Sequence, residues 1–241
     1  MTKYQPEGRH VPIRAEDRLY RKAIAGVLVA GVPLERVACK AKLGQNRRPE
    51  ERRRVIDNLW RRGAGGDVAA IHLLVRRYPE LTPARFERAG LRLACGLDPE
   101  DVEPIVDLLS DVYWTTGQPR DVIRGSITSS DAVVVAHDRS GRVIAFARAV
   151  SDGKVAWIYD VVVHPEARGT GAGTAVMELL LDHPAVRGAR RVRLGTRDAT
   201  GFYRRFGFRT LDEAPLPYPS FEMRLEAAAD AEPREGRPEE R

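Results

Sequence analysis

The sequence has few cysteines, few aromatic residues and no long apolar run. Only Cys39 and Cys95 occur among its 241 residues, which excludes a disulfide scaffold and a four-cysteine zinc site. No run approaches the ~18 apolar residues that a membrane helix needs, and no apolar signal core follows Met1. We therefore expect a cytoplasmic protein without a membrane partner or a metal, in which both thiols are buried as small hydrophobic side chains.

The remaining composition is that of a globular protein, 43% hydrophobic and 31% charged, and is long enough for one or two domains. The net charge of +6 is unevenly distributed, because residues 1–95 carry +11 and residues 96–241 carry −5. Three explanations stay open for the basic front region. Arginine could be the default surface residue, or the region could contact a nucleic acid or another acidic partner.

Residues 1–90 are expected to form a basic extension of short strands and two helices. Apolar residues between 23 and 39, interrupted by glycine and proline, predict one bent strand or two short ones. Pro49 and the acids after it begin a helix that ends at Arg62. Its apolar stripe consists of Val55, Leu59 and Trp60. Asp67 is expected to cap a second helix, to about residue 78, and 79–90 to be a connector. The apolar face of the second helix consists of Val68, Ile71, Leu74 and Val75.

From residue 91 the pattern predicts an α+β domain that extends to residue 226. Strands are expected at 91–95, 132–136, 143–150, 155–163, 191–194 and 221–225, with 132–163 forming an antiparallel meander. Helices are expected at 99–113, 119–127, 169–182 and 198–206. The tail, 227–241, contains little besides Ala, Glu, Pro and Arg, a composition typical of disorder.

A glycine-rich turn joins the strand at 155–163 to the next helix. Gly169, Gly171 and Gly173 let the backbone approach a ligand closely, and the first N–H groups of a helix attract anions. Arg168 adds a positive charge that suits phosphate oxygens. The turn is no Walker loop, because no lysine follows the last glycine. The sequence therefore predicts a phosphate-binding turn.

Two segments resemble the signatures of a known family. Residues 163–173 (VHPEARGTGAG) resemble the acetyl-CoA-binding motif of the GNAT N-acyltransferases, and residues 198–208 (DATGFYRRFGF) resemble their second signature. The resemblance extends over about residues 91–226. It implies an α-β-α GNAT fold with a mixed, mainly antiparallel central sheet, and acetyl-CoA as the acyl donor. Asp198 departs from the asparagine that many relatives carry there.

The resemblance also implies a donor site. In this family an amine attacks a thioester directly, and the leaving thiolate takes up a proton. The backbone of Val161 and Val163 would pair with the pantetheine arm. Backbone N–H groups of the turn would bind the pyrophosphate. That turn consists of Arg168, Gly169, Thr170, Gly171, Ala172 and Gly173. Tyr203 matches the family's tyrosine near the sulfur and would protonate the thiolate; the alternative is a packed core aromatic.

The general base and the acceptor wall are less well defined by the sequence. Asp160 or Glu166 could accept a proton directly or through water, and we select Asp160, whose alternative role is a structural hydrogen-bond acceptor. His164 has a suitable pKa for a base but is expected to be a spectator. The acceptor wall is expected to contain Tyr113, Trp114 and Arg148.

The front region carries a second resemblance. Residues 26–59, above all 40–47 (KAKLGQNR), resemble the C-terminal end of FMN-binding split-barrel proteins of the negative-regulator type. Gly44 departs from the commoner serine. Too few residues precede this segment to form the barrel that would hold FMN. We therefore expect no FMN.

The leading hypothesis is an N-acyltransferase that moves an acetyl group to the amine of a small metabolite. The alternative keeps the fold but takes its acyl group from an aminoacyl-tRNA, which the basic region would bind. The tRNA-binding residues would be Lys40, Lys42, Arg47, Arg48, Arg52, Arg53, Arg54, Arg61 and Arg62. A third hypothesis is a regulator that senses acyl-CoA without catalysis. The sequence leaves open whether the chain is a monomer or a homodimer.

Overall fold

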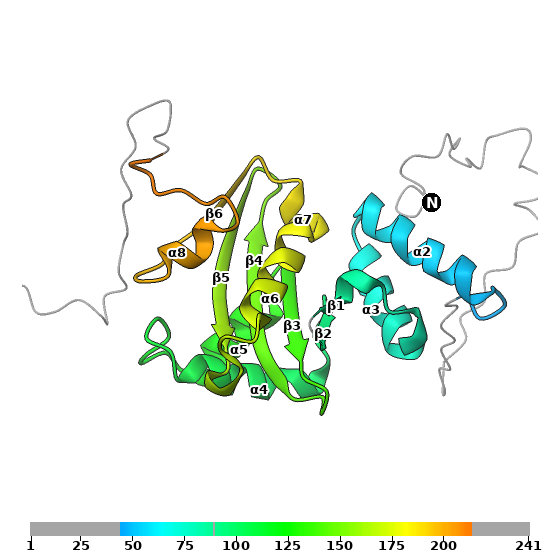
Figure 1. The fold of residues 1–241 in the computed structure, drawn as a ribbon, viewed down its shortest axis with the longest axis horizontal. Coiled ribbons are helices and arrows are strands. Elements are labelled where there is room, and N and C mark those ends of the chain that lie inside the picture. The colour runs from blue at the N-terminus through cyan, green and yellow to red at the C-terminus, as the bar shows by residue number, and fades with distance from the viewer. Residues whose placement is uncertain (1–43, 89, 214–241) are drawn as a thin grey trace, which may run out of the picture. The chain divides into compact units, whose positions relative to one another are not determined.

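The computed structural model describes residues 44–88 and 90–213, and these residues belong to one compact unit (Figure 1). The strands expected between 23 and 39 and at 221–225, the tail at 227–241, and Cys39 lie outside the described residues. Cys95 is buried and free, as expected. Burial raises the pKa of its thiol far above the usual range, so Cys95 packs as an apolar group.

A six-stranded sheet in the order β1-β2-β3-β4-β5-β6 forms the centre of the fold. The strands are β1 Glu87–Arg88, β2 Leu91–Ala94, β3 Ala132–His137, β4 Val143–Ser151, β5 Val155–Val163 and β6 Arg191–Leu194. All neighbours pair antiparallel except β5 and β6, which are parallel. This arrangement confirms the mixed, mainly antiparallel sheet and the meander of β3, β4 and β5.

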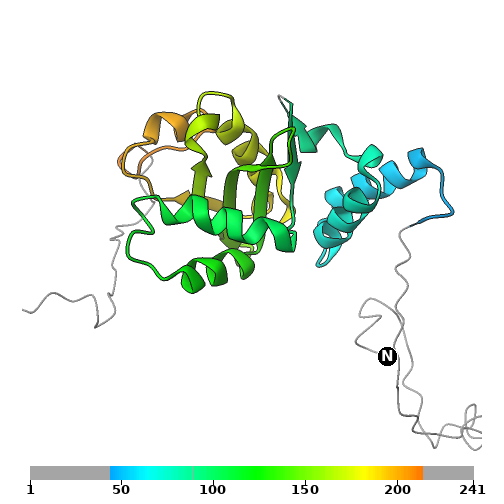
Figure 2. The same ribbon diagram turned by 90° about the horizontal axis from the view of Figure 1, so that it is seen from below.

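Helices cover both faces of the sheet. Helix α4 (Pro99–Ser110) and α5 (Arg120–Thr128) pack on one face, and α6 (Ala172–Asp182) packs on the other (Figure 2). All six residues of β3 are buried, because both of its faces are covered. A short α7 (Pro184–Arg187) follows α6, and α8 (Thr200–Arg204) follows β6. Helices α4, α6 and α8 are shorter than the expected ranges 99–113, 169–182 and 198–206.

A bulge interrupts β5 beside the bend that leads to the glycine-rich turn. Phe146 of β4 pairs with Val162, but Arg148 pairs with Tyr159, so β5 has one residue more than β4 between these pairs. Asp160 lies in the bulge with a φ of 53°, the positive φ that asparagine and aspartate tolerate best among non-glycine residues. The bulge therefore redirects the side chain of Asp160 without breaking the strand.

Two helices, α2 (Pro49–Arg62) and α3 (Asp67–Arg77), form a hairpin before the sheet. Gly63 ends α2 with a left-handed φ of 63°. The expected N-cap is wrong, because Gly66 occupies that position and Asp67 is the first helical residue. The carboxylate of Asp67 instead accepts hydrogen bonds from Ala64 N (2.8 Å) and the guanidinium of Arg62. It therefore fixes the turn between the helices.

Trp60 docks α2 on the end of α6. The buried stripe of α2 consists of Ile56 and Trp60, whereas Val55 and Leu59 are only half-buried. The Trp60 indole donates to Asp182 Oδ2 over 2.8 Å, and its ring meets those of Phe86 and His183 edge to face. Arg187 of α7 donates to the backbone carbonyls of Trp60 and Arg61. These tertiary hydrogen bonds satisfy carbonyl groups at the C-terminal end of α2 that have no partner within the helix.

Residues 79–90, expected as a connector, contain two 3-10 turns as well as β1. These are η1 (Pro79–Leu81) and η2 (Ala84–Phe86). In α3, Ile71 and Leu74 are buried, and Val68 and Val75 are half-buried. The expected domain boundary lies at residue 90. The α2–α3 hairpin before this boundary nevertheless contacts the part of the chain after it, because α2 packs on α7.

Candidate functional site

The glycine-rich turn presents unpaired backbone donors at the start of α6. A 3-10 turn, η3 (Pro165–Ala167), leads from β5 into it. Gly169 and Gly171 have φ angles of 79° and 92°, and a Cβ at either position would meet nothing within 4 Å. Among the described residues, the N–H groups of Gly169, Gly171, Ala172 and Gly173 have no acceptor. The turn therefore has the open concave backbone of an anion site.

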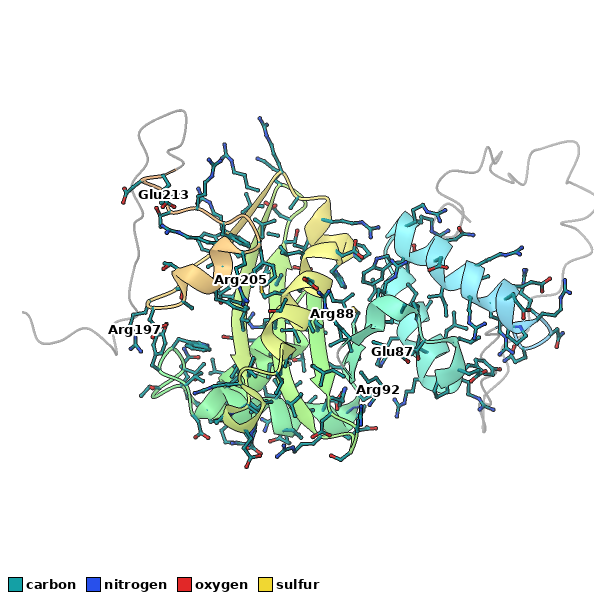
Figure 3. All side chains as sticks on the ribbon, in the orientation of Figure 1. Glu87, Arg88, Arg92, Arg197, Arg205 and Glu213 are labelled. Carbon is teal, nitrogen blue, oxygen red and sulfur yellow. The ribbon has the colours of Figure 1, made fainter. Side chains whose placement is uncertain are left out.

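Close packing explains the third glycine. A Cβ on Gly173 would lie 3.3 Å from Val163 Cγ2 and 3.5 Å from the Phe202 ring. The start of α6 therefore packs directly on β5 and α8. Arg168 is exposed beside the turn. Arg205, which the sequence analysis did not select, brings a second cation, because its Nη2 lies 3.5 Å from Thr174 Oγ1 in the first turn of α6 (Figure 3).

Strands β5 and β6 pair for only part of the length of β5. Their parallel ladder ends at Ile158 and Leu194, so the β5 backbone from Tyr159 to Val163 has no β6 partner. Val161 and Val163 lie in this unpaired stretch. The two strands therefore splay apart beyond Ile158, which leaves strand backbone available to an extended ligand.

Tyr203 lies on α8 beside the splayed strands. Its ring packs on Phe202 and Phe208, with centroid distances of 5.0 and 6.1 Å. Burial raises the pKa of its phenol, and the neighbouring Tyr113 raises it further, so the hydroxyl stays protonated at neutral pH. It borders a cavity of about 700 Å³ whose wall contains Trp157, Arg193 and Phe208. Four arginines and no acidic residue line this cavity.

Asp160 joins two residues of the expected acceptor wall. Arg148 Nε donates to Asp160 Oδ2 over 2.5 Å, and Trp114 Nε1 donates to Oδ1 over 3.1 Å. The Asp160 side chain is 9% exposed and that of Arg148 is 12% exposed. The structure therefore brings together three predicted residues from three elements, and both carboxylate oxygens of Asp160 already accept fixed hydrogen bonds.

Tyr113 connects the α4–α5 loop to the loop before α8. Its ring meets Trp114 edge to face at 4.9 Å. The Arg197 guanidinium lies 3.7 Å above the Tyr113 ring, and the Arg197 backbone N–H donates to the Tyr113 hydroxyl over 3.4 Å (Figure 3). The sequence analysis missed Arg197. Its position three residues after a strand end was the signal that could have suggested it.

The other candidate bases already have intramolecular partners. Glu166 accepts a hydrogen bond from Arg142 Nη1 over 2.9 Å, which lowers the pKa of its carboxyl. His164 Nδ1 accepts from Glu166 N over 3.3 Å and so caps the 3-10 turn. These contacts favour structural roles for both residues.

The described basic residues proposed for tRNA lie on α2 or directly before it, at the end of α6 that is remote from the glycine turn. Helix α2 packs on α3, η1 and α7, and Trp60 contacts Asp182 at the last residue of α6, whereas the glycine turn precedes the first residue of α6. Lys40 and Lys42 lie outside the described residues. Several of these arginines have intramolecular partners: Arg48, which precedes α2, pairs with Glu51, Arg53 donates to the Glu80 carbonyl, Arg61 to Asn58 and Arg62 to Asp67, and Arg52 lies over the Tyr78 ring. Arg47 is exposed before α2, and Arg54 is exposed on it.

Residues 44–88 and 90–213 contain no group of three or more His, Cys, Asp or Glu side chains that could hold a metal ion. None of the helices in those ranges has the length and apolar character to cross a membrane.

Comparison with known proteins places this geometry in a family. Residues 102–208 match the model of the acetyltransferase (GNAT) family. The chain is 38% identical over 109 residues to GCN5-related N-acetyltransferase 1, chloroplastic, of Arabidopsis thaliana, a match that covers 43% of this chain and 55% of that protein. It is 36% identical over 125 residues to serotonin N-acetyltransferase 2, chloroplastic, of Oryza sativa subsp. japonica, covering 48% and 59%. The chain thus spans less than two thirds of either relative.

A solved structure from Xanthomonas campestris pv. campestris, described as an acetyltransferase of the GNAT family, is 30% identical. That match covers 58% of this chain and 98% of the other, with a TM-score of 0.48. The family model spans the glycine turn, the splayed strands and Tyr203. Through residues 102–208, the chain belongs to the GNAT family of acetyltransferases.

Proposed function

We propose that this protein transfers the acetyl group of acetyl-CoA to the amine of a small metabolite. The observation that carries the proposal is a continuous path along one edge of the sheet. It leads from the unpaired N–H groups at the start of α6, past the part of β5 that has no β6 partner, to the hydroxyl of Tyr203. This path matches in order the phosphate, the extended arm and the reacting end of an acyl-CoA.

The donor site fits its proposed ligand. The N–H groups from Gly169 to Gly173 would hold the pyrophosphate, and the positive φ angles there leave no Cβ in the way. Arg168 and Arg205 would supply positive charge to the phosphates. Val161 and Val163 would pair their backbone with the pantetheine amides, as an added strand does.

Tyr203 would serve the departing sulfur. In the transfer, the amine nitrogen forms a bond to the thioester carbon, the carbon–sulfur bond breaks, and the thiolate takes up a proton. Tyr203 can donate that proton or a strong hydrogen bond, because its raised pKa keeps it protonated. The amine nitrogen loses its own proton to water.

We assign Asp160 to positioning rather than to proton removal. The Arg148 guanidinium and the Trp114 indole occupy one oxygen each, so a proton acceptor role would require an existing bond to break. In the positioning role, Asp160 holds Arg148 of β4 and Trp114 of the α4–α5 loop in fixed positions. The alternative with an aminoacyl-tRNA donor stays a prediction, and no described contact between α2 and the cleft favours it.

Calorimetric titration with acetyl-CoA tests the donor site. Gly171→Glu should abolish binding, because it brings a carboxylate to the pyrophosphate position. Gly141→Glu is a matched control, since Gly141 also has a positive φ, of 86°, with nothing within 4 Å of a built Cβ, but lies in the β3–β4 turn. Wild type and Gly141→Glu should bind alike. Absence of binding in folded wild type, or equal binding by Gly171→Glu, would refute the proposal.

A further inference from the structure

Two consecutive aromatic residues of the α4–α5 loop join the two strands that diverge around the donor site. Trp114 Nε1 donates over 3.1 Å to Oδ1 of Asp160, which lies on β5 two residues beyond the last residue paired with β6. Tyr113 contacts Arg197, three residues beyond the end of β6. The Arg197 guanidinium lies 3.7 Å from the Tyr113 ring centroid, and its backbone N–H donates to the Tyr113 hydroxyl over 3.4 Å (Figure 3). The aromatic pair therefore spans the splay where the strands begin to separate.

The backbone that carries this aromatic pair is held by its own hydrogen bonds. Thr115, the next residue, is 6% exposed, and its hydroxyl bonds to the carbonyls of Leu109 and Val112. The rings of Tyr113 and Trp114 also meet each other edge to face at 4.9 Å. The pair is therefore fixed on the loop side as well as on the strand side, and a ligand can displace either ring only by breaking existing contacts.

The acyl end of the proposed donor would arrive at this pair. The arm would follow the β5 backbone from Val163 to Val161, so the thioester would lie beside Asp160. Ahead of it, β5 and β6 are paired, and paired strands are only about 4.8 Å apart, which leaves no room for a chain between them. Besides burial, Tyr113 raises the pKa of Tyr203, so the pair lies near the hydroxyl proposed to serve the sulfur. The acyl group would therefore meet the strand ladder ahead and the aromatic pair beside it.

We infer that Tyr113 and Trp114 limit the acyl chain of the donor to about the length of an acetyl group. This inference rests on the proposed acetyl transfer and names the residues that set the donor specificity of the same site. An acetyl group ends beside the pair, whereas each further methylene must displace a ring that is held on two sides. In an open apolar channel, the same methylenes would be buried and would strengthen binding. The two arrangements therefore predict opposite effects of chain length.

Calorimetric titration of the full chain with CoA, acetyl-CoA and butyryl-CoA tests the inference without an acceptor. CoA measures the binding of the arm alone. Butyryl-CoA should bind wild type about 5- to 150-fold more weakly than acetyl-CoA, because it overfills a packed site. An open channel would instead strengthen binding by about fourfold for each added methylene. Equal or tighter binding of butyryl-CoA would overturn the inference.

Matched variants show whether the aromatic pair is the source of this length penalty. Trp114→Ala should let butyryl-CoA bind at least as tightly as acetyl-CoA, with the Kd of CoA unchanged. Arg197→Ala alters a side chain that is 64% exposed and removes only the cation over Tyr113, so the penalty should fall about 2- to 5-fold. Tyr78→Ala is the control, because the Tyr78 ring also lies under an arginine, Arg52 at 4.2 Å, but at the end of α3. A penalty that neither site variant reduces, or that Tyr78→Ala reduces equally, would contradict the assignment.

The length limit and the proposed function fail in different ways. Folded wild type that binds neither CoA nor its acyl derivatives overturns the donor site, and both proposals with it. Binding of all three compounds without a penalty for butyryl-CoA overturns the length limit alone and leaves the acetyl-CoA site intact.

Discussion

Acidification should loosen the attachment of α2 through a single imidazole. His183 is 3% exposed between α6 and α7, packs edge to face on Trp60, and accepts a hydrogen bond from Ala185 N through Nδ1. Burial lowers the pKa of His183 to about 4, and the charge of Arg187 contributes further. Protonation would thus break a helix cap and introduce an unpaired charge at the contact with α2.

The magnitude follows from the difference between the folded and unfolded pKa values of this group. Because the folded value lies below the unfolded value of 6.5, the stabilisation is complete above pH 6.5. It is lost as the pH falls toward 4. Full loss amounts to about 3 kcal/mol. At pH 4.5 the loss should already be about 2.5 kcal/mol.

Urea unfolding at pH 7.5 and pH 4.5 measures this loss, with His183→Asn as the matched variant. Asparagine is a good N-cap and can still accept from Ala185 N, but it does not titrate. Carboxylates elsewhere affect both proteins equally. Wild type should therefore lose about 2.5 kcal/mol more than the variant between the two pH values. Equal losses would refute the reasoning, because they would mean that His183 is not held neutral by burial.

Three further predictions concern the site and its support. Asp160→Asn should lower stability by about 3–5 kcal/mol in urea unfolding, because it leaves a buried guanidinium without a counter-charge, while kcat changes less than the KM for the amine; loss of kcat alone would restore Asp160 as the base. Tyr203→Phe should lower kcat at least about 100-fold with acetyl-CoA binding intact, and the fall in wild-type rate at alkaline pH, which the raised pKa of Tyr203 moves above the usual range of a phenol, should vanish. Gly96→Ala places a Cβ 2.5 Å from the His72 ring and should cost about 1–3 kcal/mol, whereas Gly65→Ala, which meets nothing within 4 Å, should be nearly neutral; equal thermal midpoints would contradict this.

Features encoded within a few residues could be predicted well from the sequence. The glycine turn at 168–173 depends on backbone freedom at consecutive positions, so the residue types alone indicate it. Strand β5 has its expected bounds, 155–163, because turn residues stand directly before and after an apolar run. Strand β6, at 191–194, was delimited in the same way.

Features that depend on distant partners could not be predicted in the same way. Trp114 and Asp160 are 46 residues apart, and their hydrogen bond depends on a bulge that no local pattern indicates. The predicted stripe of α2 is confirmed for Trp60 but wrong for Val55 and Leu59, which are half-buried, and it omits the buried Ile56. Ile56 and Trp60 are buried there because Asp182, 122 residues after Trp60, supplies the partner for the indole. Helical periodicity defines the spacing of such a stripe, but tertiary contacts decide its direction.

The bonds from Arg187 to the end of α2 have a consequence for biosynthesis. Residue 60 leaves the ribosome 127 residues before its partner exists. At a synthesis rate of about 5–20 residues per second, that interval is about 6–25 s. Helix α3 and Phe86 are made early enough to pack on α2 within it, but the carbonyls of Trp60 and Arg61 must wait for Arg187. The C-terminal turn of α2 therefore reaches its final hydrogen bonding only after α7 has been synthesised.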